Sequence, residues 1–546
     1  VSPSMRGGIF FLALHALSAL LLSCPVSEAM ASPAVRPASL ETLFSTLRNI
    51  ASLRQAKALV EWDQLVMMSH ADATSKARGG HLAALAGVIH EKSTAGELGD
   101  AIAAAERDLA KGGADARDMA AVRDARRDFD METKISSELA TRKAALSAEA
   151  YSTWNKARTA SDFSMFEETL SRCFAVAAEV AEARADGRPI YDTCLDEFER
   201  GMPAERIAGI FDEVKAALQP LIQQVLQSEH KPSEAPLSTP TGVDSFDLKA
   251  QETLNKDIVK SLGFNFDQGR VDVSVHPFTT SFSPADVRIT SRFNDKEWYQ
   301  GLAGSVHECG HAMYESQLRD TGLPVDQALS MGVHESQSLF WERHIGLSRP
   351  FWKWCGPKVR DALGVVGDDE ELYRAVNHVK QGFIRVEADE LTYPMHVILR
   401  YTLERKLMSG EMTVAELPEA WNRGMEELLG VEVPDDAKGC LQDVHWSALA
   451  IGYFPTYLLG AMMAAQLSHY IRQDAEFRAA HGDVDELIAA GNFAPFKEWL
   501  RVHIHDNGSL HDSMDTLLQA EFGEPLMPKY FISYLQDKYA DIYQLA

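Results

Sequence analysis

Apolar positions along the first half of the chain recur every three or four residues, which is the spacing of one face of an α-helix. Leucine and isoleucine follow this spacing from Leu40 to Leu59, with Ser39 before the run as the expected N-cap. Segments rich in Ala, Glu and Arg continue the pattern to about residue 227. Three prolines interrupt it between residues 228 and 244, where we expect a surface loop.

The pattern changes from a helical period to alternation between residues 269 and 293. Valines occupy alternate positions in 269–276, and apolar residues alternate again in 286–293, which predicts two β-strands. After residue 300 the helical spacing returns and continues to the C-terminus, with a break at Gly491. The chain is therefore predicted to be mainly α, with a small sheet before its second helical half.

A single HExxH motif, residues 307–311, follows the predicted strands directly. On a helix, His307 and His311 lie on one face and can bind one Zn²⁺, while Glu308 can take a proton from the attacking water. A catalytic site of this kind also needs a third protein ligand and an open position. The motif predicts a metallopeptidase; a polar helix face that binds no metal is the alternative interpretation.

The third ligand must come from another part of the chain. Enzymes that continue the motif as HExxHxxGxxH carry a histidine six residues after the second one, but Gln317 stands there, so that class is excluded. Glu335 and Glu342 lie one heptad apart on the next predicted helix. We favour Glu335, because its neighbours are small or polar, and expect Glu342 to be an ion-pair partner.

Length and charge narrow the class of protein. The chain has 546 residues and no long linker, so residues 39–546 are predicted to form one catalytic unit. A formal net charge of -26 without a Lys/Arg cluster argues against nucleic-acid binding. The six cysteines stand far apart without a CxxC pair, which indicates free thiols rather than a disulfide framework.

The first 38 residues resemble a targeting segment. Arg6 precedes an apolar run from Ile9 to Leu22, and small residues around Ala29 have the form of a cleavage site. The run is too short for a stable membrane span. Export by a secretory or lipoprotein signal, and a cytoplasmic protein whose true start is Met30, both remain open.

Six motifs in a fixed order resemble the M32 metallocarboxypeptidase family, of the carboxypeptidase Taq type. The resemblance runs from about Leu40 to the C-terminus and also includes Trp62-Asp63-Gln64, whereas residues 67–70 depart from the MPxG-like stretch of the family. The motifs are HPF at 276–278, DxRxT at 286–290, HExxH at 307–311, HESQ at 334–337, IRxxAD at 384–389 and GxxQDxHW at 439–446.

The resemblance implies a fold, a metal site and an assembly. It implies an almost wholly helical, saddle-like unit with a deep groove and a small β-sheet beside the HExxH helix, and usually a homodimer. It also implies that His307, His311 and Glu335 hold one divalent metal ion. The same His/His/Glu set accepts Zn²⁺, Co²⁺ or Mn²⁺, of which zinc is our expectation.

Other residues are expected to stabilise the oxyanion of the tetrahedral intermediate. His445 is the first candidate, because it stands in the GxxQDxHW motif. Tyr453 and Tyr457 are chosen by analogy with related peptidases. Which of the two tyrosines assists is left open.

A carboxypeptidase must also bind the free carboxylate of its substrate, and arginine suits a planar anion. Arg385 of the IRxxAD motif is our choice, assisted by His276. Arg288 competes with it, although an internal pair with Asp286 explains Arg288 at least as well. Asp389, Gln442 and Asp443 are expected to support the ligating histidines. A structural role is expected for His334.

These residues predict an enzyme that releases single C-terminal amino acids from peptides with broad specificity. A dipeptidyl carboxypeptidase or oligopeptidase with the same metal chemistry is the alternative. A non-catalytic helical binding protein that has lost its metal is disfavoured, because the predicted ligands and base are all present. Peptides are the expected partners.

Overall fold

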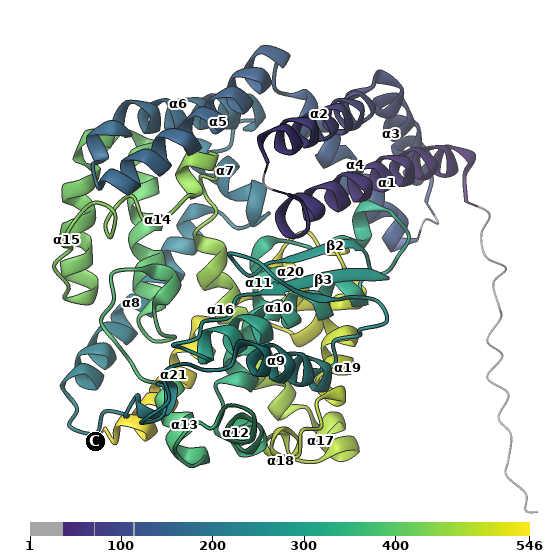
Figure 1. Ribbon diagram of the computed structural model, residues 1–546. Coiled ribbons are helices and arrows are strands. Elements are labelled where there is room, and N and C mark those ends of the chain that lie inside the picture. The colour runs from purple at the N-terminus through teal and green to yellow at the C-terminus, as the bar shows by residue number, and fades with distance from the viewer. Residues whose placement is uncertain (1–35, 70, 113–114, 546) are drawn as a thin grey trace, which may run out of the picture.

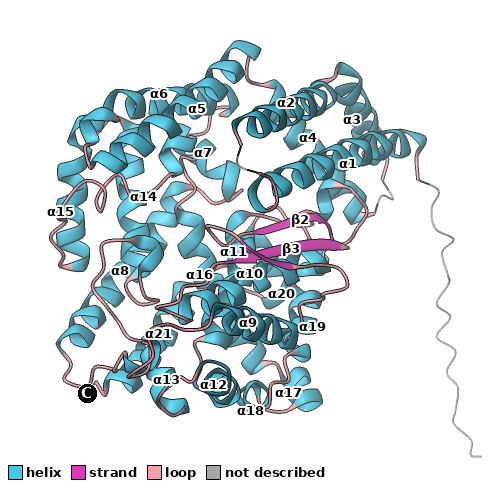
Figure 2. Ribbon diagram, viewed as in Figure 1, coloured by secondary structure: helices cyan, strands magenta, loops and turns pink. Residues whose placement is uncertain are grey.

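The protein is mainly helical with one small sheet, which confirms the predicted fold class (Figures 1 and 2). The structure is a computed structural model and describes residues 36–69, 71–112 and 115–545. Apart from residues 36–38, the predicted targeting segment lies outside the described residues. No helix in the described ranges is both long and apolar enough to span a membrane.

The N-terminal helices form an arm with a small core, to which Leu323 and Val325 also contribute. Leu43, Phe44 and Ile102 are fully buried in this core. The prediction that Ser39 caps the first helix is wrong, because Pro37 holds the N-cap position and the Ser39 hydroxyl donates to Asp108 instead, at 2.5 Å. The arm consists of α1 (Ala38–Val66), α2 (Asp72–Thr94), α3 (Gly96–Leu109) and α4 (Ala116–Thr133).

The next helices belong to the large core that spans the rest of the molecule. The predicted loop after residue 227 is confirmed, since only a 3₁₀ turn, Ala235–Leu237, interrupts it. Five helices make up this part of the chain: α5 (Ser137–Ala160), α6 (Glu167–Arg184), α7 (Ile190–Phe198), α8 (Ala204–Gln227) and α9 (Leu248–Leu262).

The sheet has three strands, β1 (Val271–Val273), β2 (Thr279–Ser283) and β3 (Asp286–Ser291), in the order β1-β3-β2. The two predicted strands are β1 and β3, which pair in parallel, and β2 pairs antiparallel to β3. Sequence patterning missed β2 because Phe282 is its only apolar residue. The arm helix α1 lies along β2 (Figure 1), where Trp62 contacts Phe278 edge to face.

Two glycines let the helices that carry the HExxH and HESQ motifs approach closely. The first, α10 (Tyr299–Gln317), crosses α11 (Met331–Leu339) at Gly310, where an added Cβ would lie 2.7 Å from the Gln337 carbonyl oxygen. The third helix of this group, α16 (Pro455–Gln473), meets α11 at Gly460, where a Cβ would lie 2.8 Å from that of Glu335. A π-helical segment, Phe340–Gly346, continues α11.

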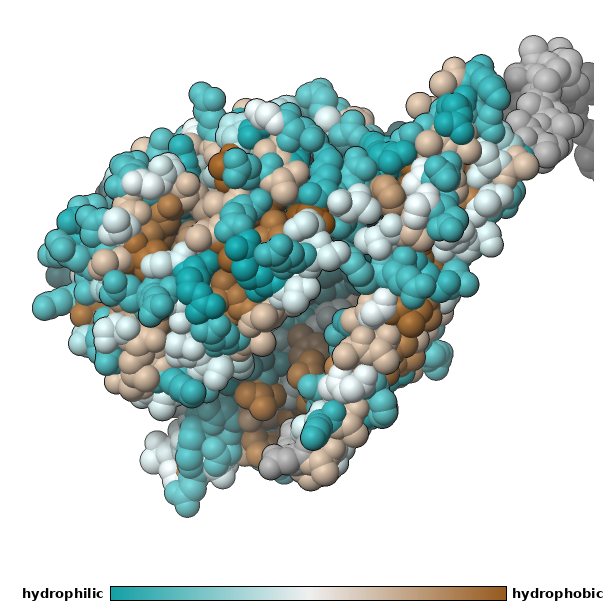
Figure 3. Space-filling view, turned by 90° about the horizontal axis from the view of Figure 1, so that it is seen from above, coloured by the Kyte–Doolittle hydropathy of each residue, from teal (hydrophilic) through white to brown (hydrophobic). Residues whose placement is uncertain are grey.

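The remaining helices enclose this trio. They are α12 (Arg349–Leu363), α13 (Asp369–Val376), α14 (Tyr393–Ser409), α15 (Leu417–Leu429), α17 (Ala475–His481), α18 (Val484–Ala489), α19 (Ala494–His503), α20 (Met514–Phe522) and α21 (Pro528–Tyr543). The predicted break at Gly491 is confirmed between α18 and α19. Seen from above, the surface has a deep hollow between the α1–α4 arm and the main body (Figure 3).

Candidate active site

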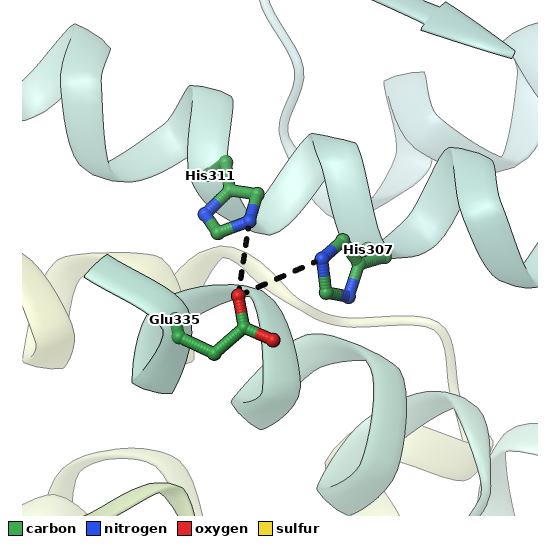
Figure 4. Close-up of side chains that lie close together, drawn as sticks. All are labelled: His307, His311 and Glu335. Carbon is green, nitrogen blue, oxygen red and sulfur yellow. Dashed lines mark ion pairs between the residues drawn. The ribbon is translucent and has the colours of Figure 1, made fainter. Parts of the chain in front are cut away.

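The structure brings His307, His311 and Glu335 together, as the sequence predicted (Figure 4). One Glu335 carboxylate oxygen lies 3.9 Å from Nε2 of His307 and 3.5 Å from Nε2 of His311. Ligand atoms around a tetrahedral zinc ion, with bonds of about 2.1 Å, lie roughly 3.4 Å apart. The three donor atoms are therefore spaced for one ion of this kind, and two histidines with one glutamate form a known donor set of catalytic zinc.

Glu342 lies behind the first histidine of the motif. Nδ1 of His307 donates to a Glu342 carboxylate oxygen at 2.6 Å, which leaves Nε2 free to face Glu335. Burial lowers the pKa of His307, but Glu335 and Glu342 outweigh burial and raise the pKa to about 10. Glu342 is thus an ion-pair partner, as predicted, and its partner is the histidine whose orientation the site requires.

Glu308 is buried and held by the strand that sequence patterning missed. The hydroxyl of Thr279, on β2, lies 2.6 Å from a Glu308 carboxylate oxygen and 3.1 Å from the Glu308 carbonyl oxygen. Because that hydroxyl has one hydrogen, it donates best to the closer carboxylate. Thr279 follows the HPF motif directly, and that position is the only sequence signal for its role.

His334 supports the site from one side. Its ring stacks on His311 with centroids 4.4 Å apart, and its Nε2 donates to Glu315 at 2.9 Å. With that nitrogen engaged by Glu315, the arrangement agrees with the structural role expected for His334. His505, for which the sequence predicts no role, is buried between Gln317 at 2.8 Å and Gln337 at 2.9 Å and so links α10 to α11.

Arg385 lies in a buried cluster with a surplus of positive charge. One oxygen of Asp443 accepts from Nε and Nη2 of Arg385, at 3.1 and 3.0 Å, and the other accepts from Arg400 at 2.6 Å. The third nitrogen of Arg385 donates to the Tyr393 hydroxyl at 3.2 Å. Among the described residues, two guanidinium groups thus face one carboxylate, and Arg400 is a member that no sequence motif indicated.

The three residues predicted to be supporting carboxylates and amides contact other groups than expected. Gln442 accepts from the backbone of Arg385 at 2.9 Å and from Arg400 at 2.7 Å. Asp389 accepts from the backbone and hydroxyl of Thr392. With Asp443 they hold the arginines and the loop beside them, and none of these hydrogen bonds reaches a histidine of the HExxH motif.

His445, Tyr453 and Tyr457, the three candidates for the oxyanion site, lie together. Nε2 of His445 lies 3.1 Å from the Tyr457 hydroxyl, and the Tyr453 ring centroid lies 5.4 Å from that of His445. Burial, supported by the charges of Arg385 and Arg400, outweighs the opposing effect of Asp443 and lowers the pKa of His445 to about 4. His445 is therefore neutral at pH 7 and has one N–H to donate.

The two remaining predicted substrate residues lie on the sheet and its loop. Arg288 pairs with Asp286 through two hydrogen bonds of 2.8 and 2.7 Å and covers the Phe282 ring, so the internal-pair interpretation is confirmed. The His276 side chain is exposed, with no hydrogen-bond partner among the described residues. The HPF and DxRxT motifs are joined, because Thr290 accepts from the backbone of Phe278 at 3.0 Å.

A buried carboxyl outside the predicted set, that of Glu199, holds the start of α11. It accepts from the backbone N–H of Gly332 at 2.9 Å, and burial raises its pKa from 4.5 to about 8. Because the folded protein keeps this proton longer than the unfolded chain, the group stabilises the fold below pH 4.5. That stability is lost as the pH rises towards 8, by on the order of a few kcal/mol.

The glutamine variant of this residue tests the pH dependence. Glutamine resembles the protonated carboxyl, so Glu199→Gln should match the wild type in urea denaturation at pH 4. At pH 8 the variant should be the more stable of the two. Equal urea midpoints at both pH values would contradict the raised pKa of Glu199.

Comparisons with known proteins find similarity over most of the chain. The family model for carboxypeptidase Taq (M32) metallopeptidase matches residues 42–539. Carboxypeptidase 1 of Bacillus subtilis is 34% identical over 508 residues, covering 92% of this chain and 98% of that protein. Thermostable carboxypeptidase 1 of Thermus thermophilus is 35% identical over 519 residues, covering 93% of this chain and 99% of that protein. The crystal structure of the M32 carboxypeptidase from Deinococcus radiodurans R1 superposes with a TM-score of 0.86 at 31% identity, covering 93% and 100%.

Proposed function

Because the chain belongs to the carboxypeptidase Taq (M32) metallopeptidase family and is a metallocarboxypeptidase, we propose that it releases single C-terminal amino acids from peptides with broad specificity. The observation that supports this most directly is the pairing of a His/His/Glu donor set with a positively charged arginine cluster. Burial raises the pKa values of Tyr393 and Tyr453, and the charges of Glu335 and Arg385 also act on both, so both tyrosines lie within electrostatic reach of the two groups. A substrate whose scissile bond lies near the donor set can thus place its terminal carboxylate near Arg385.

The residues present fit one divalent metal ion, which we propose to be zinc, with Co²⁺ or Mn²⁺ as alternatives. His307, His311 and Glu335 would hold the ion, and the hydrogen bond from His307 to Glu342 would fix the tautomer of that ligand. When bound, such an ion supplies Lewis-acid polarisation of the substrate carbonyl and makes the attacking water more acidic. Every other step falls to side chains.

Glu308 is the proposed general base. Its carboxylate takes a proton from the attacking water and returns it to the nitrogen of the leaving amino acid. Thr279 holds one carboxylate oxygen by a hydrogen bond, so the other oxygen is left for the water. That bond fixes the orientation of Glu308 before the substrate arrives.

Hydrogen-bond donors opposite the donor set are proposed to stabilise the oxyanion. Neutral His445 can donate one N–H, and the hydroxyls of Tyr453 and Tyr457 can donate one each. The hydrogen bond between His445 and Tyr457 restrains both side chains and uses the hydrogen of one of them, so the partner that accepts can turn its own hydrogen to the oxyanion beside that of Tyr453. Such restraint lets the donors act without reorganisation when charge develops on the carbonyl oxygen.

The terminal carboxylate of the substrate is proposed to bind at the arginine cluster. Asp443 neutralises only one of the two guanidinium groups that it contacts, so an anion is needed to balance the other. Arg385 is the candidate that contacts the tyrosines of the site, through Tyr393 and the face of the Tyr457 ring at 4.6 Å. Among the described strands β2, whose Thr279 contacts Glu308, is at an edge of the sheet, and we propose that its backbone pairs with the substrate chain.

A peptide and its C-terminally amidated twin test the proposal. The free-acid peptide should lose one residue at a time, whereas amidation removes the anion and should lower kcat/KM by about a hundredfold or more, the cost of leaving a buried charge unpaired. Mass spectrometry of both peptides, incubated with metal-loaded protein, measures this. Release of dipeptides or internal cleavage of the amidated peptide would instead support the oligopeptidase alternative.

We also expect a homodimer, as the family resemblance implies. Sedimentation equilibrium of the purified protein measures the mass directly. A monomer at micromolar concentration would contradict this expectation.

A further inference from the structure

Most of the segment from His445 to Tyr453 lies outside helices and strands, so regular backbone hydrogen bonds do not fix its conformation. It contains one 3₁₀ turn, His445–Ala448, and then two residues with left-handed backbone, Leu449 at φ +57° and Gly452 at φ +91°. A side chain at residue 452 would meet the α7 backbone, since an added Cβ would lie 2.9 Å from the Leu195 nitrogen. Other contacts must therefore fix this segment, which carries two of the proposed oxyanion donors.

A single carboxylate, that of Glu404 on α14, accepts hydrogen bonds from both ends of the segment. One of its oxygens accepts from the indole N–H of Trp446 at 2.8 Å, and the other accepts from the backbone N–H of Gly452 at 3.0 Å. The second oxygen also accepts from the Tyr191 hydroxyl on α7 at 2.9 Å. The donors on the segment adjoin His445 and Tyr453 in the chain.

The surroundings of Glu404 point to positioning rather than charge pairing. The side chain has no exposed surface, and no Lys, Arg or His of the described residues forms an ion pair with it. A buried carboxylate without a cation costs free energy that an apolar side chain would not. What the carboxylate adds is three directed hydrogen bonds, two from the two ends of the segment and one from α7.

We propose that Glu404 is a positioning residue that sets the segment 445–453 and thereby aims His445 and Tyr453 at the reacting carbonyl. The inference deepens the proposed function and rests on it. Glu404 touches neither the substrate nor the donor set, so it acts through Trp446 and Gly452. Its loss should therefore affect the transition state more than the binding of substrate or metal.

Three variants test the role of Glu404. Glu404→Gln keeps the shape but turns one acceptor into an NH₂ group, which then faces an N–H or O–H donor. Trp446→Phe removes the anchor next to His445 and serves as the second test if the first variant folds poorly. Tyr191→Phe is the matched control, because it removes a donor to the same carboxylate and leaves both anchors of the segment in place.

The measurement is kcat and KM on a free-acid peptide, expressed per mole of bound metal, together with zinc affinity by chelator competition. Glu404→Gln and Trp446→Phe should lower kcat about tenfold or more, while KM and zinc affinity change less than about threefold. Tyr191→Phe should stay within about twofold of the wild type.

The outcomes separate this inference from the proposed function. A wild type that releases no single residues would overturn both. An active wild type with unchanged kcat per bound metal in Glu404→Gln and Trp446→Phe would overturn the inference alone. A kcat loss of equal size in Tyr191→Phe would do the same, because it would show that any disturbance of this part of the core acts alike.

Discussion

Replacing Glu308 with glutamine is expected to lower kcat by about a thousandfold while the protein keeps its full content of metal. The amide has nearly the shape of the carboxylate, and its oxygen can still accept from the Thr279 hydroxyl. It cannot take a proton from water, so the loss reports on the base alone. The measurement pairs steady-state kinetics on a free-acid peptide with metal analysis of the same protein sample.

Two further variants sharpen this test of the general base. Glu308→Asp keeps a carboxylate but withdraws it by one methylene, and should recover only part of the activity. Thr279→Val removes the hydrogen bond that orients Glu308 and should cost less than either change to the base. Substantial activity in Glu308→Gln, or loss of metal from it, would contradict the role of general base.

The second large effect is expected at the third metal ligand. Loss of a partner behind a ligating histidine costs about 10- to 100-fold in metal affinity, so Glu342→Gln should fall in that range. The loss of metal affinity in Glu335→Gln should be larger than this range, because the substitution weakens a metal ligand itself. Competition with a chelator of known affinity measures both variants under the same conditions.

This pair of variants distinguishes Glu335, which sequence reasoning favoured as the third ligand, from Glu342, its expected ion-pair neighbour. Each contacts His307, at 3.9 Å for Glu335 and 2.6 Å for Glu342, but only Glu335 also lies near His311. Reversed affinities, with Glu342→Gln the weaker binder, would show that the ligand set is wrong. Glu315→Gln, which removes the partner of His334, serves as a control for disturbance of α10.

Much of the metal centre could be predicted because its residues follow one another at fixed helical spacing. HExxH specifies two positions on α10, and Glu335 was preferred to Glu342 on the next helix because its neighbours are small or polar. The partners of these residues were harder to foresee. Thr279 lies on a strand with little apolar alternation, and so neither the strand nor its hydrogen bond to Glu308 could be read from periodicity.

The arginine cluster shows a different limit of sequence reasoning. The motifs indicated Arg385 and Asp443, but Arg400 lies on α14 outside every motif and shares the same carboxylate. Burial of such a charge depends on which segments the fold brings together, 42 to 58 residues apart in the chain. The same reasoning applies to Glu404 on α14, whose donors come from α7 and from the segment 445–453.

The crossing of α10 and α11 at Gly310 has a consequence for how such motifs are recognised in other chains. The backbone of Gln337 leaves no room for a side chain at residue 310, and the approach of the two helices there sets how far Glu335 must reach. The fourth position of HExxH is written as unrestricted, yet in this architecture it carries a size limit. A search pattern that requires glycine there, together with a downstream HESQ, would separate chains able to assemble this centre from chains that contain HExxH alone.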